Sequence, residues 1–277
     1  MAQILDGKLQ AATIREQVKE RISAMQGKRP CMAVVQVGND PASTVYIGQK
    51  EKACQFVGIE FRRVALDENI SQQDMLAEID ALNADDSVHG FIVQKPLPAQ
   101  LNDHEIVCRI DPRKDIDCLH PYNVGLVAES RGTLLPCTPA GVIALLDAYD
   151  IELKGKHCVI VGRSSIVGKP LALMMLNRDA TVTTIHSHTV GMADFCRQAD
   201  VLVVAVGKPN LITADMIKPG CILVDVGINR LDGKLCGDVD YENCFDKASH
   251  ITPVPGGVGP MTVAMLMANG LKAWESL

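Results

Sequence analysis

Two side chains that can exchange a proton, a phenol and an amine, stand four residues apart in the segment TVYIGQKEKACQFVG. They are Tyr46 and Lys50. Residues at this spacing lie on one face of a helix, one turn apart, so the phenol and the amine can share a proton network. Taken alone, the pair is more simply interpreted as an amphipathic tyrosine beside a solvated lysine. Lys52, on another face of the same helix, is an example of such a solvated lysine.

The segment KHCVIVGRSSIVGKPLALMM has the layout of a turn that binds a dinucleotide. An apolar run leads into Gly162, a polar loop follows, and Gly168 opens an apolar helix with Pro170 in its first turn. The match to GxGxxG is imperfect, because Ser164 replaces the second glycine and the third is displaced to Gly168. A tight turn without a ligand therefore stays open. The phenol and amine precede this turn, whereas in short-chain dehydrogenases they follow it, so chain order disfavours that class.

The end of the next apolar run, TIHSHT, bears on the choice between NAD and NADP. An NAD site usually places Asp or Glu there to bind the ribose 2′-hydroxyl. This chain has His186 and Ser187 instead, with Arg163 in the preceding loop to pair with a phosphate, which favours NADP. His186 and His188 have no third ligand nearby, so we expect no metal site.

The elements that position these residues alternate between strand and helix in the first part of the chain. Helices are indicated by three- and four-residue apolar spacing or by capping residues, and strands by short apolar runs. We expect a helix over 11–25, a strand at 31–37, a helix over 44–57 ended by Gly58, a strand at 59–66, a helix begun by Ser71 with Asp74 as its capping box, and a strand at 89–94.

The second part of the chain predicts a parallel sheet. The stretch 119–137 has no sustained period, so a domain border is expected there, followed by a helix over 138–149. Continuous β-branched runs indicate strands buried on both faces. These runs are KHCVIVG, TVTTIHS, VLVVAVG and CILVDVG, and a final helix covers GPMTVAMLMANGLKAW.

Composition narrows the classes of function. The chain has 277 residues, of which 47% are apolar and 22% charged, as in ordinary globular proteins of one or two domains. A net charge of −6 and an aromatic share of 4% disfavour nucleic acid as a partner. The apolar runs are too short to span a bilayer, so no membrane partner is expected.

The ten cysteines include no CxxC pair, and the opening MAQILDGKLQ has no signal-peptide pattern. We therefore expect buried thiols in a cytoplasmic protein.

Several separate segments now agree, in order, with one family. The chain closely resembles the bifunctional methylenetetrahydrofolate dehydrogenase/methenyltetrahydrofolate cyclohydrolase (FolD) family along essentially its whole length. The segments are ASTVYIGQKEKAC, GFIVQKPLP, PRKDIDCLHPYNVG, PCTPAGV, VGRSSIVGKP, VAVGKP, VDVGINR, GDVDY and ITPVPGGVGPMTVAML.

The resemblance implies a two-domain α/β fold. An N-terminal α/β domain over 1–120 binds folate, and its final helix, 259–277, returns to it from the end of the chain. Residues 121–258 form a Rossmann-like domain that binds NADP. The relatives are homodimers, so a homodimer is expected.

The resemblance also implies roles for the site residues. Lys50 activates water or assists proton transfer in the hydrolytic step, and Gln94 orients Lys50 by hydrogen bonding. Tyr46 offers its ring to the folate, and Asp117 accepts hydrogen bonds from the pterin. The implied substrate-binding residues are Tyr46, Lys50, Gln94, Asp117, Pro255 and Gly256. The first four of these are also the implied catalytic residues. The implied cofactor-binding residues are Gly162, Arg163, Ser164, Ser187 and Ile228.

Two departures from the family pattern flank this site. Lys95 stands where many members carry an apolar residue, and Cys118 where glycine commonly follows the aspartate. We expect both to affect local shape, and the larger side chain at 118 to shift Asp117.

The implied activity is oxidation of 5,10-methylenetetrahydrofolate with NADP, followed by hydrolysis to 10-formyltetrahydrofolate, which feeds purine biosynthesis in one-carbon metabolism. A monofunctional dehydrogenase of the same fold, or a folate- or nucleotide-binding module without catalysis, remains an alternative.

Overall fold

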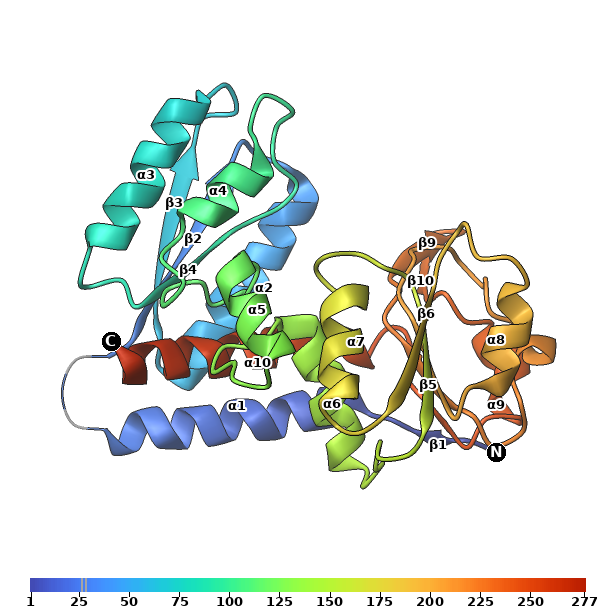
Figure 1. Cartoon of the computed structure of the whole chain (residues 1–277). Coiled ribbons are helices and arrows are strands. Elements are labelled where there is room, and N and C mark those ends of the chain that lie inside the picture. The colour runs from blue at the N-terminus through green and yellow to red at the C-terminus, as the bar shows by residue number, and fades with distance from the viewer. Residues whose placement is uncertain (26, 28) are drawn as a thin grey trace. The chain divides into compact units, whose positions relative to one another are not determined.

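The computed structural model describes residues 1–25, 27 and 29–277, and the chain divides into two compact units (Figure 1). Unit 1 comprises Met1–Ala11, Val127–Ser130 and Thr138–Thr262, and unit 2 comprises Ala12–Leu126, Arg131–Cys137 and Val263–Leu277. The domain borders expected from the sequence, 1–120 with 259–277 and 121–258, stay a prediction.

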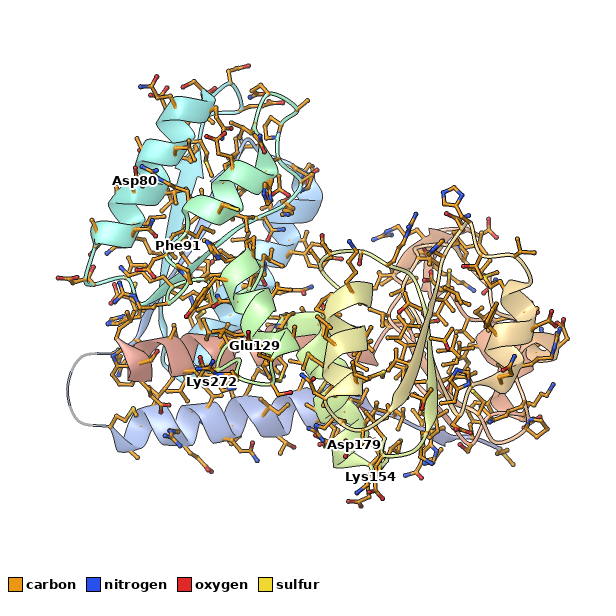
Figure 2. The ribbon with its side chains drawn as sticks, viewed as in Figure 1. Asp80, Phe91, Glu129, Lys154, Asp179 and Lys272 are labelled. Atoms are coloured by element: carbon orange, nitrogen blue, oxygen red, sulfur yellow. The ribbon has the colours of Figure 1, made fainter. Side chains whose placement is uncertain are left out.

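Unit 2 is built on a parallel sheet in the order β3-β2-β4. Its strands are β2 (Cys31–Val37), β3 (Glu60–Leu66) and β4 (Gly90–Val93). Every residue of β2 and β4 is buried, and Phe91 on β4 packs into the apolar core of the unit (Figure 2). This is the pattern of strands covered on both faces by helices.

The helices that lie wholly or mostly in unit 2 come before, between and after its strands along the chain. They are α1 (Gly7–Ala24), α2 (Pro41–Val57), α3 (Gln72–Ala84), α4 (Asp103–Arg109), α5 (Pro121–Ala128) and α10 (Val258–Ser276). From Val263 onward α10 belongs to unit 2, which confirms that the final helix returns to the first part of the chain. The cap on α3 is also confirmed, because the Ser71 hydroxyl accepts the Asp74 N–H at 3.1 Å.

Three expectations for the helices were wrong. Helix α1 begins at Gly7, four residues before the expected start at 11, because the Asp6 carboxylate accepts the Leu9 N–H at 3.0 Å. Helix α2 begins at Pro41, three residues before the expected start at 44, because the Asp40 carboxylate accepts the Ser43 N–H at 2.7 Å and proline suits the first helical position. The stretch 119–137, expected to be irregular, contains α5. The left-handed cap at Gly58, with φ of 89°, lies where the sequence predicts it.

Unit 1 is a Rossmann-like unit with a parallel sheet in the order β1-β11-β8-β7-β5-β6. Its strands are β1 (Gln3–Ile4), β5 (His157–Val161), β6 (Thr181–Ile185), β7 (Val201–Val204), β8 (Ile222–Asp225) and β11 (His250–Ile251), with an antiparallel hairpin of β9 (Asn229–Leu231) and β10 (Lys234–Cys236). The helices are α6 (Cys137–Ala148), α7 (Gly168–Leu176), α8 (Met192–Gln198), α9 (Tyr241–Phe245) and a 3₁₀ turn (Ala214–Met216).

The sheet of unit 1 fixes where its loops meet. The four apolar runs of the sequence form β5, β6, β7 and β8, as predicted. Because neighbouring strands are parallel, their carboxyl ends share one edge of the sheet, and β5 lies at the point where the chain order reverses between β6 and β7. Open sheets of this kind bind ligands at that edge.

Candidate active site

Lys50 and Gln94 meet in unit 2. Lys50 lies on α2, and Gln94 directly follows β4. The Lys50 Nζ donates a hydrogen bond to the Gln94 Oε1 at 2.8 Å, and the Gln94 Nε2 donates to the Lys95 carbonyl at 2.8 Å. Since both ends of the amide are engaged, its oxygen is held toward the amine.

The surroundings of Lys50 favour loss of its proton. Burial lowers the pKa of the Lys50 amine from its usual value, while the negative charge of Asp117 opposes that shift. A lysine amine with a lowered pKa gives up its proton more readily than an ordinary lysine, as a general base requires. Lys50, Gln94 and Asp117, which come from a helix, a strand end and a loop, are thus brought together.

Cys137 is a site residue that the sequence interpretation missed. Its buried thiol, at the start of α6, lies within hydrogen-bonding reach of the Asp117 carboxylate and 3.5 Å from the Ile116 carbonyl. Burial, then the charge of Asp117, raises the pKa of the Cys137 thiol well above its usual value, so the thiol is neutral and can donate. The available signal was its place in the segment PCTPAGV, which matched the family.

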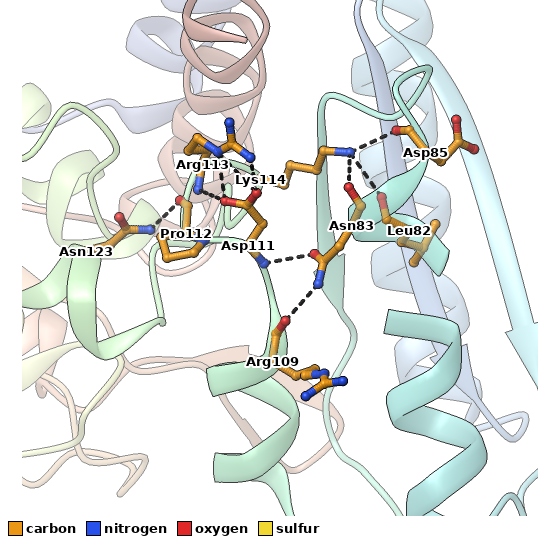
Figure 3. A network of polar contacts seen from close by, with 9 residues as sticks. All are labelled: Leu82, Asn83, Asp85, Arg109, Asp111, Pro112, Arg113, Lys114 and Asn123. Carbon is orange, nitrogen blue, oxygen red and sulfur yellow. Dashed lines mark hydrogen bonds and ion pairs between the residues drawn. The ribbon is translucent and has the colours of Figure 1, made fainter. Parts of the chain in front are cut away.

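The backbone before Asp117 is held by a buried cation, Lys114 (Figure 3). Its Nζ donates to the carbonyls of Leu82, Asn83 and Asp85 at 3.1, 2.9 and 2.8 Å, which lie at the end of α3. Carbonyls at a helix C-terminus lack partners within the helix, so a buried ammonium satisfies them.

The backbone after Asp117 is held by a buried carboxylate, Asp115. It accepts the backbone N–H groups of Leu119 at 3.2 Å and His120 at 2.8 Å. Its Oδ2 also accepts the Asn123 side-chain amide at 2.9 Å. That amide donates to the Pro112 carbonyl as well (Figure 3). Burial raises the pKa of Asp115, and these hydrogen bonds oppose the rise. Asp117 itself, between these buried neighbours, is partly exposed.

Tyr46 lies one turn before Lys50 on α2, and 46% of the residue is exposed. An exposed ring on the helix that carries Lys50 is free to stack on a flat ligand.

The turn after β5 has the close packing that a dinucleotide site needs. Gly162 has φ of 127°, and a Cβ there would lie 2.5 Å from the Ala205 carbonyl oxygen. A Cβ at Gly168 would lie 2.2 Å from the Gly162 carbonyl oxygen. Neither position has room for a Cβ, so only glycine fits. The backbone of the turn therefore passes close to the start of α7, and residues 163–166 after Gly162 are exposed.

Charged and hydroxyl groups surround this turn. The Ser164 hydroxyl accepts the N–H groups of Val167 at 3.1 Å and Gly168 at 3.4 Å. Partial desolvation and the positive charge of Arg163 lower the pKa of His186, so Arg163 lies close to the end of β6. Ser187 follows His186 and is exposed. Arg163 follows β5 and Ser187 follows the neighbouring β6. A guanidinium and a hydroxyl can contact a phosphate on a ribose, so the chemistry of these residues fits NADP.

The other predicted site residues of unit 1 lie in loops at the carboxyl ends of its strands. Ile228 follows β8 and is 50% exposed. Pro255 and Gly256 follow β11, with Pro255 joined by a cis peptide bond and Gly256 at φ of 119°.

Both departures from the family pattern have a structural explanation. The Lys95 amine forms an ion pair with Asp103 at 2.6 Å, while its carbonyl accepts the Gln94 amide. Cys118 adopts the left-handed φ of 57°, which explains why glycine is common at this position. Its buried thiol donates to the Leu134 carbonyl at 3.3 Å.

The described residues include no group of three or more His, Cys, Asp or Glu side chains placed to hold a metal ion. In the same part of the chain, none of the helices is both long enough and apolar enough to cross a membrane.

Two family models match the chain. The model described as "Tetrahydrofolate dehydrogenase/cyclohydrolase, catalytic domain" matches residues 5–117. The model described as "Tetrahydrofolate dehydrogenase/cyclohydrolase, NAD(P)-binding domain" matches residues 136–277. Together they cover most of the chain and correspond to its folate-site and dinucleotide-site segments.

Known proteins are similar over the full length. "Bifunctional protein FolD" of Agathobacter rectalis is 50% identical over 278 residues, which cover 99% of this chain and 100% of the relative. The crystal structure of the FolD methylenetetrahydrofolate dehydrogenase/cyclohydrolase from Campylobacter jejuni is 48% identical, with a TM-score of 0.98 and full coverage of both chains. The Trypanosoma brucei enzyme, solved with NADP and an inhibitor, is 36% identical with a TM-score of 0.94, covering 99% of this chain and 98% of that one.

Proposed function

Since this chain belongs to the tetrahydrofolate dehydrogenase/cyclohydrolase family, we propose that it is a bifunctional, NADP-dependent enzyme of folate metabolism. It oxidises 5,10-methylenetetrahydrofolate to the 5,10-methenyl compound and hydrolyses that compound to 10-formyltetrahydrofolate. NADP supplies the hydride acceptor of the first reaction.

One observation supports the hydrolytic role above all others: the Lys50 amine, with its pKa lowered by burial, donates to the fixed oxygen of Gln94 at 2.8 Å. In the hydrolysis, water attacks the cationic methenyl carbon and must lose a proton. We assign the acceptance of that proton to Lys50, and the orientation of Lys50 to Gln94. The positive charge of the substrate itself makes a metal ion unnecessary for the attack.

We assign the binding of the pterin to Asp117 and Tyr46. The Asp117 carboxylate can accept hydrogen bonds from the amino and ring N–H groups of the pterin, which a charged acceptor makes strong. The exposed Tyr46 ring offers a flat apolar surface to the folate. Anchoring the substrate by its pterin leaves the one-carbon bridge free to react.

We assign the cofactor to the loops at the strand ends of unit 1. Gly162 and Ser164 border the turn that would bind the phosphates, Arg163 and Ser187 would contact the 2′-phosphate, and Ile228 would contact the cofactor. By the family resemblance, the loop that carries Pro255 and Gly256 would flank the bound substrate and nicotinamide. Hydride transfer then depends on how closely the nicotinamide approaches the bridge carbon.

An absorbance assay tests the activity directly. Purified protein is mixed with 5,10-methylenetetrahydrofolate and either NADP or NAD, and methenyl absorbance is followed. The methenyl compound is then supplied without cofactor, and its decay is measured. We expect both reactions, with NADP preferred. Dehydrogenase activity without hydrolysis would contradict the bifunctional assignment.

We also propose that the chain forms a homodimer and acts in the cytoplasm. The ten cysteines, all within the described ranges, are free thiols, which suits a reducing compartment. Sedimentation equilibrium of the purified protein tests the dimer, and fractionation of the source cells tests the compartment.

A further inference from the structure

Two carboxylates in unit 1 are buried, although the proposed reaction assigns neither of them a role. Asp225 is the last residue of β8, and Asp238 lies two residues beyond β10. Their exposed fractions are 4% and 0%. A buried carboxylate is costly unless hydrogen bonds compensate it, so the partners of each one indicate what it does.

Asp238 holds the loop after β7. Its Oδ2 accepts the N–H groups of Val206 at 2.7 Å and Gly207 at 3.0 Å, and its Oδ1 accepts the Lys208 N–H at 2.8 Å. Successive N–H groups that converge on one anion fix the course of the loop. The Oδ1 also accepts the Asn229 side-chain amide at 2.8 Å, which ties this loop to the one after β8.

Asp225 holds the segment that carries Asp238. Its Oδ1 accepts the backbone N–H groups of Gly227 and Asp238, both at 3.0 Å, and its Oδ2 accepts the Val239 N–H at 2.9 Å. Asp225 therefore binds the segment that carries Asp238, and Asp238 in turn binds the loop after β7 and the side chain of Asn229, four residues after Asp225. We call Asp225 and Asp238 the crossed carboxylate pair.

Glycines make room for this pair. A Cβ at Gly227 would lie 2.2 Å from the Asp238 side chain, and a Cβ at Gly237 would lie 1.8 Å from the Asp225 side chain. Neither φ at these glycines falls in the left-handed range, so the constraint is one of space. The two carboxylates thus explain why a glycine stands two residues after Asp225 in VDVGIN and directly before Asp238 in CGDV.

The backbone of Asp225 is also hydrogen-bonded to the loop after β11. The Asp225 N–H donates to the Thr252 hydroxyl at 2.7 Å. Thr252 precedes Pro255 and Gly256 in the same loop. The two carboxylates therefore connect the loops after β7 and β8, and the Thr252 hydroxyl joins the loop after β11 to the backbone of Asp225. Ile228, between residues bound by the pair, projects from this framework into solvent.

We propose that Asp225 and Asp238 are positioning residues for the nicotinamide cofactor, a role that rests on the proposed function. They set the loops that the cofactor contacts, with Ile228 at the tip of one of them. Burial raises the pKa of Asp225 to about 6, against the effect of its N–H partners, which underlines how costly the pair is. Apolar residues of the same volume usually stabilise a core as well as buried charges do, so geometry explains the pair better than stability.

The test is Asp238→Asn, which replaces one acceptor oxygen with an NH₂ group that faces backbone N–H donors. The dissociation constant of NADP is measured by calorimetry, and methenyl hydrolysis is measured without NADP. We expect NADP binding to weaken by about tenfold or more, because a bond to a charged group is lost and a donor is left unpaired. Hydrolysis, which depends on Lys50 in unit 2, should stay within about twofold of the parent rate.

A matched control is Asp232→Asn, the same substitution at an exposed position between β9 and β10, which should leave NADP binding unchanged. If Asp238→Asn fails to fold, Asn229→Ala removes a single bond to Asp238 and should weaken NADP binding by about threefold. Folded variants that bind NADP as the parent does would overturn the inference. Failure of the parent protein itself to bind NADP would instead overturn the proposed function.

Discussion

The backbone beside Asp117 and the loops of unit 1 are both fixed by buried charged side chains, but the charges differ. Beside Asp117, Lys114 collects carbonyls and Asp115 collects N–H groups, so adjacent residues of opposite charge hold opposite kinds of backbone group. In unit 1 both members of the crossed carboxylate pair are negative, and both collect N–H groups. The buried charge sums to zero in the first region and is negative in the second.

This difference has consequences for each region. A neutral arrangement can be buried over a wide pH range, whereas two like charges compete for a proton as the pH falls. In the proposed function, side chains of unit 2 act on the substrate, and a glycine turn with flanking side chains of unit 1 binds the cofactor. Damage in unit 2 should therefore appear in hydrolysis and in overall stability, and damage in unit 1 in cofactor binding and in its pH dependence.

The largest expected effect is that of Lys50→Met, which keeps the length of the side chain and removes the amine. Methenyl hydrolysis should fall by about 100-fold or more, since general acid–base catalysis contributes roughly that much. Dehydrogenase activity should fall less, because hydride transfer depends on the approach of the nicotinamide. Steady-state rates of both reactions measure the split.

Lys52→Met is the matched control for Lys50→Met. Lys52 lies on another face of α2 and is exposed, so its removal should leave both reactions unchanged. Hydrolysis at the parent rate in Lys50→Met would contradict the role of the amine.

Lys114→Met tests the neutral arrangement in unit 2. The carbonyls of Leu82, Asn83 and Asp85 would lose a buried partner, so the free energy of unfolding should fall by about 3 kcal/mol. The Michaelis constant for folate should rise for both reactions, since Lys114 fixes the backbone before Asp117. Urea unfolding and kinetics measure the two effects, and Arg113→Met, which removes an exposed ion pair, should cost at most about 1 kcal/mol.

The crossed carboxylate pair should make stability depend on pH. The pKa of Asp225 is about 6 in the folded protein against 3.8 for an ordinary aspartate, so the folded state holds the proton more tightly. Its stabilising contribution is present in full below about pH 4 and is lost as the pH rises through 6, a change of about 3 kcal/mol in all.

Asp225→Asn cannot titrate and isolates this contribution. From pH 4 to pH 7, the unfolding free energy of the parent should fall by about 2 kcal/mol relative to that of the variant. Urea unfolding across this range measures it. A difference that stays constant with pH would show that Asp225 keeps its ordinary pKa.

Much of the fold could be predicted because its signals are local. The apolar runs that form β5 to β8, the Ser71 cap and the Gly58 cap depend on a few neighbouring residues. Strands β1 and β11 have two residues each, too short for a period, and they form only because partners distant in sequence pair with them. Helix α5 follows a segment whose buried carboxylate, Asp115, binds the turn before it, which no local pattern reveals.

In the candidate active site, too, local features could be predicted from the sequence and contacts between distant residues could not. The spacing of Tyr46 and Lys50 is visible in the sequence, but the Lys50–Gln94 bond joins residues 44 positions apart. Lys114 and Asp115 look like part of an exposed charged run in PRKDID, yet both are buried. Cys137 was grouped with ordinary core cysteines, since only its fold neighbours, Asp117 and Lys50, distinguish it.

Arg163→Ala tests the cofactor side of the comparison. Arg163 lies close to the end of β6, and it is exposed, so its contact with a 2′-phosphate should contribute about 1 to 2 kcal/mol. NADP should therefore lose more affinity than NAD by this amount. Dissociation constants for both cofactors measure it, with Lys154→Ala as an exposed cation elsewhere in unit 1 (Figure 2). Equal losses for NADP and NAD would contradict the assignment.

The smallest expected effect concerns Cys118, next to Asp117. Cys118→Gly relieves the left-handed φ of 57°, which costs a residue with a side chain about 1 kcal/mol. It also removes a buried thiol that donates to the Leu134 carbonyl, and glycine adds freedom to the unfolded chain. These terms oppose one another, so the unfolding free energy should change by less than about 1 kcal/mol.

Comparison with Cys118→Ala separates the terms. Alanine loses the same thiol but keeps the left-handed strain, so the glycine variant should be the more stable of the two by about 0.5 kcal/mol, although alanine usually stabilises more than glycine. Urea unfolding measures the order. Because Lys114 and Asp115 hold the backbone on both sides of Asp117, both variants should keep the parent Michaelis constant for folate. A rise in that constant in Cys118→Gly would mean that the cysteine itself, and not its charged neighbours, places Asp117.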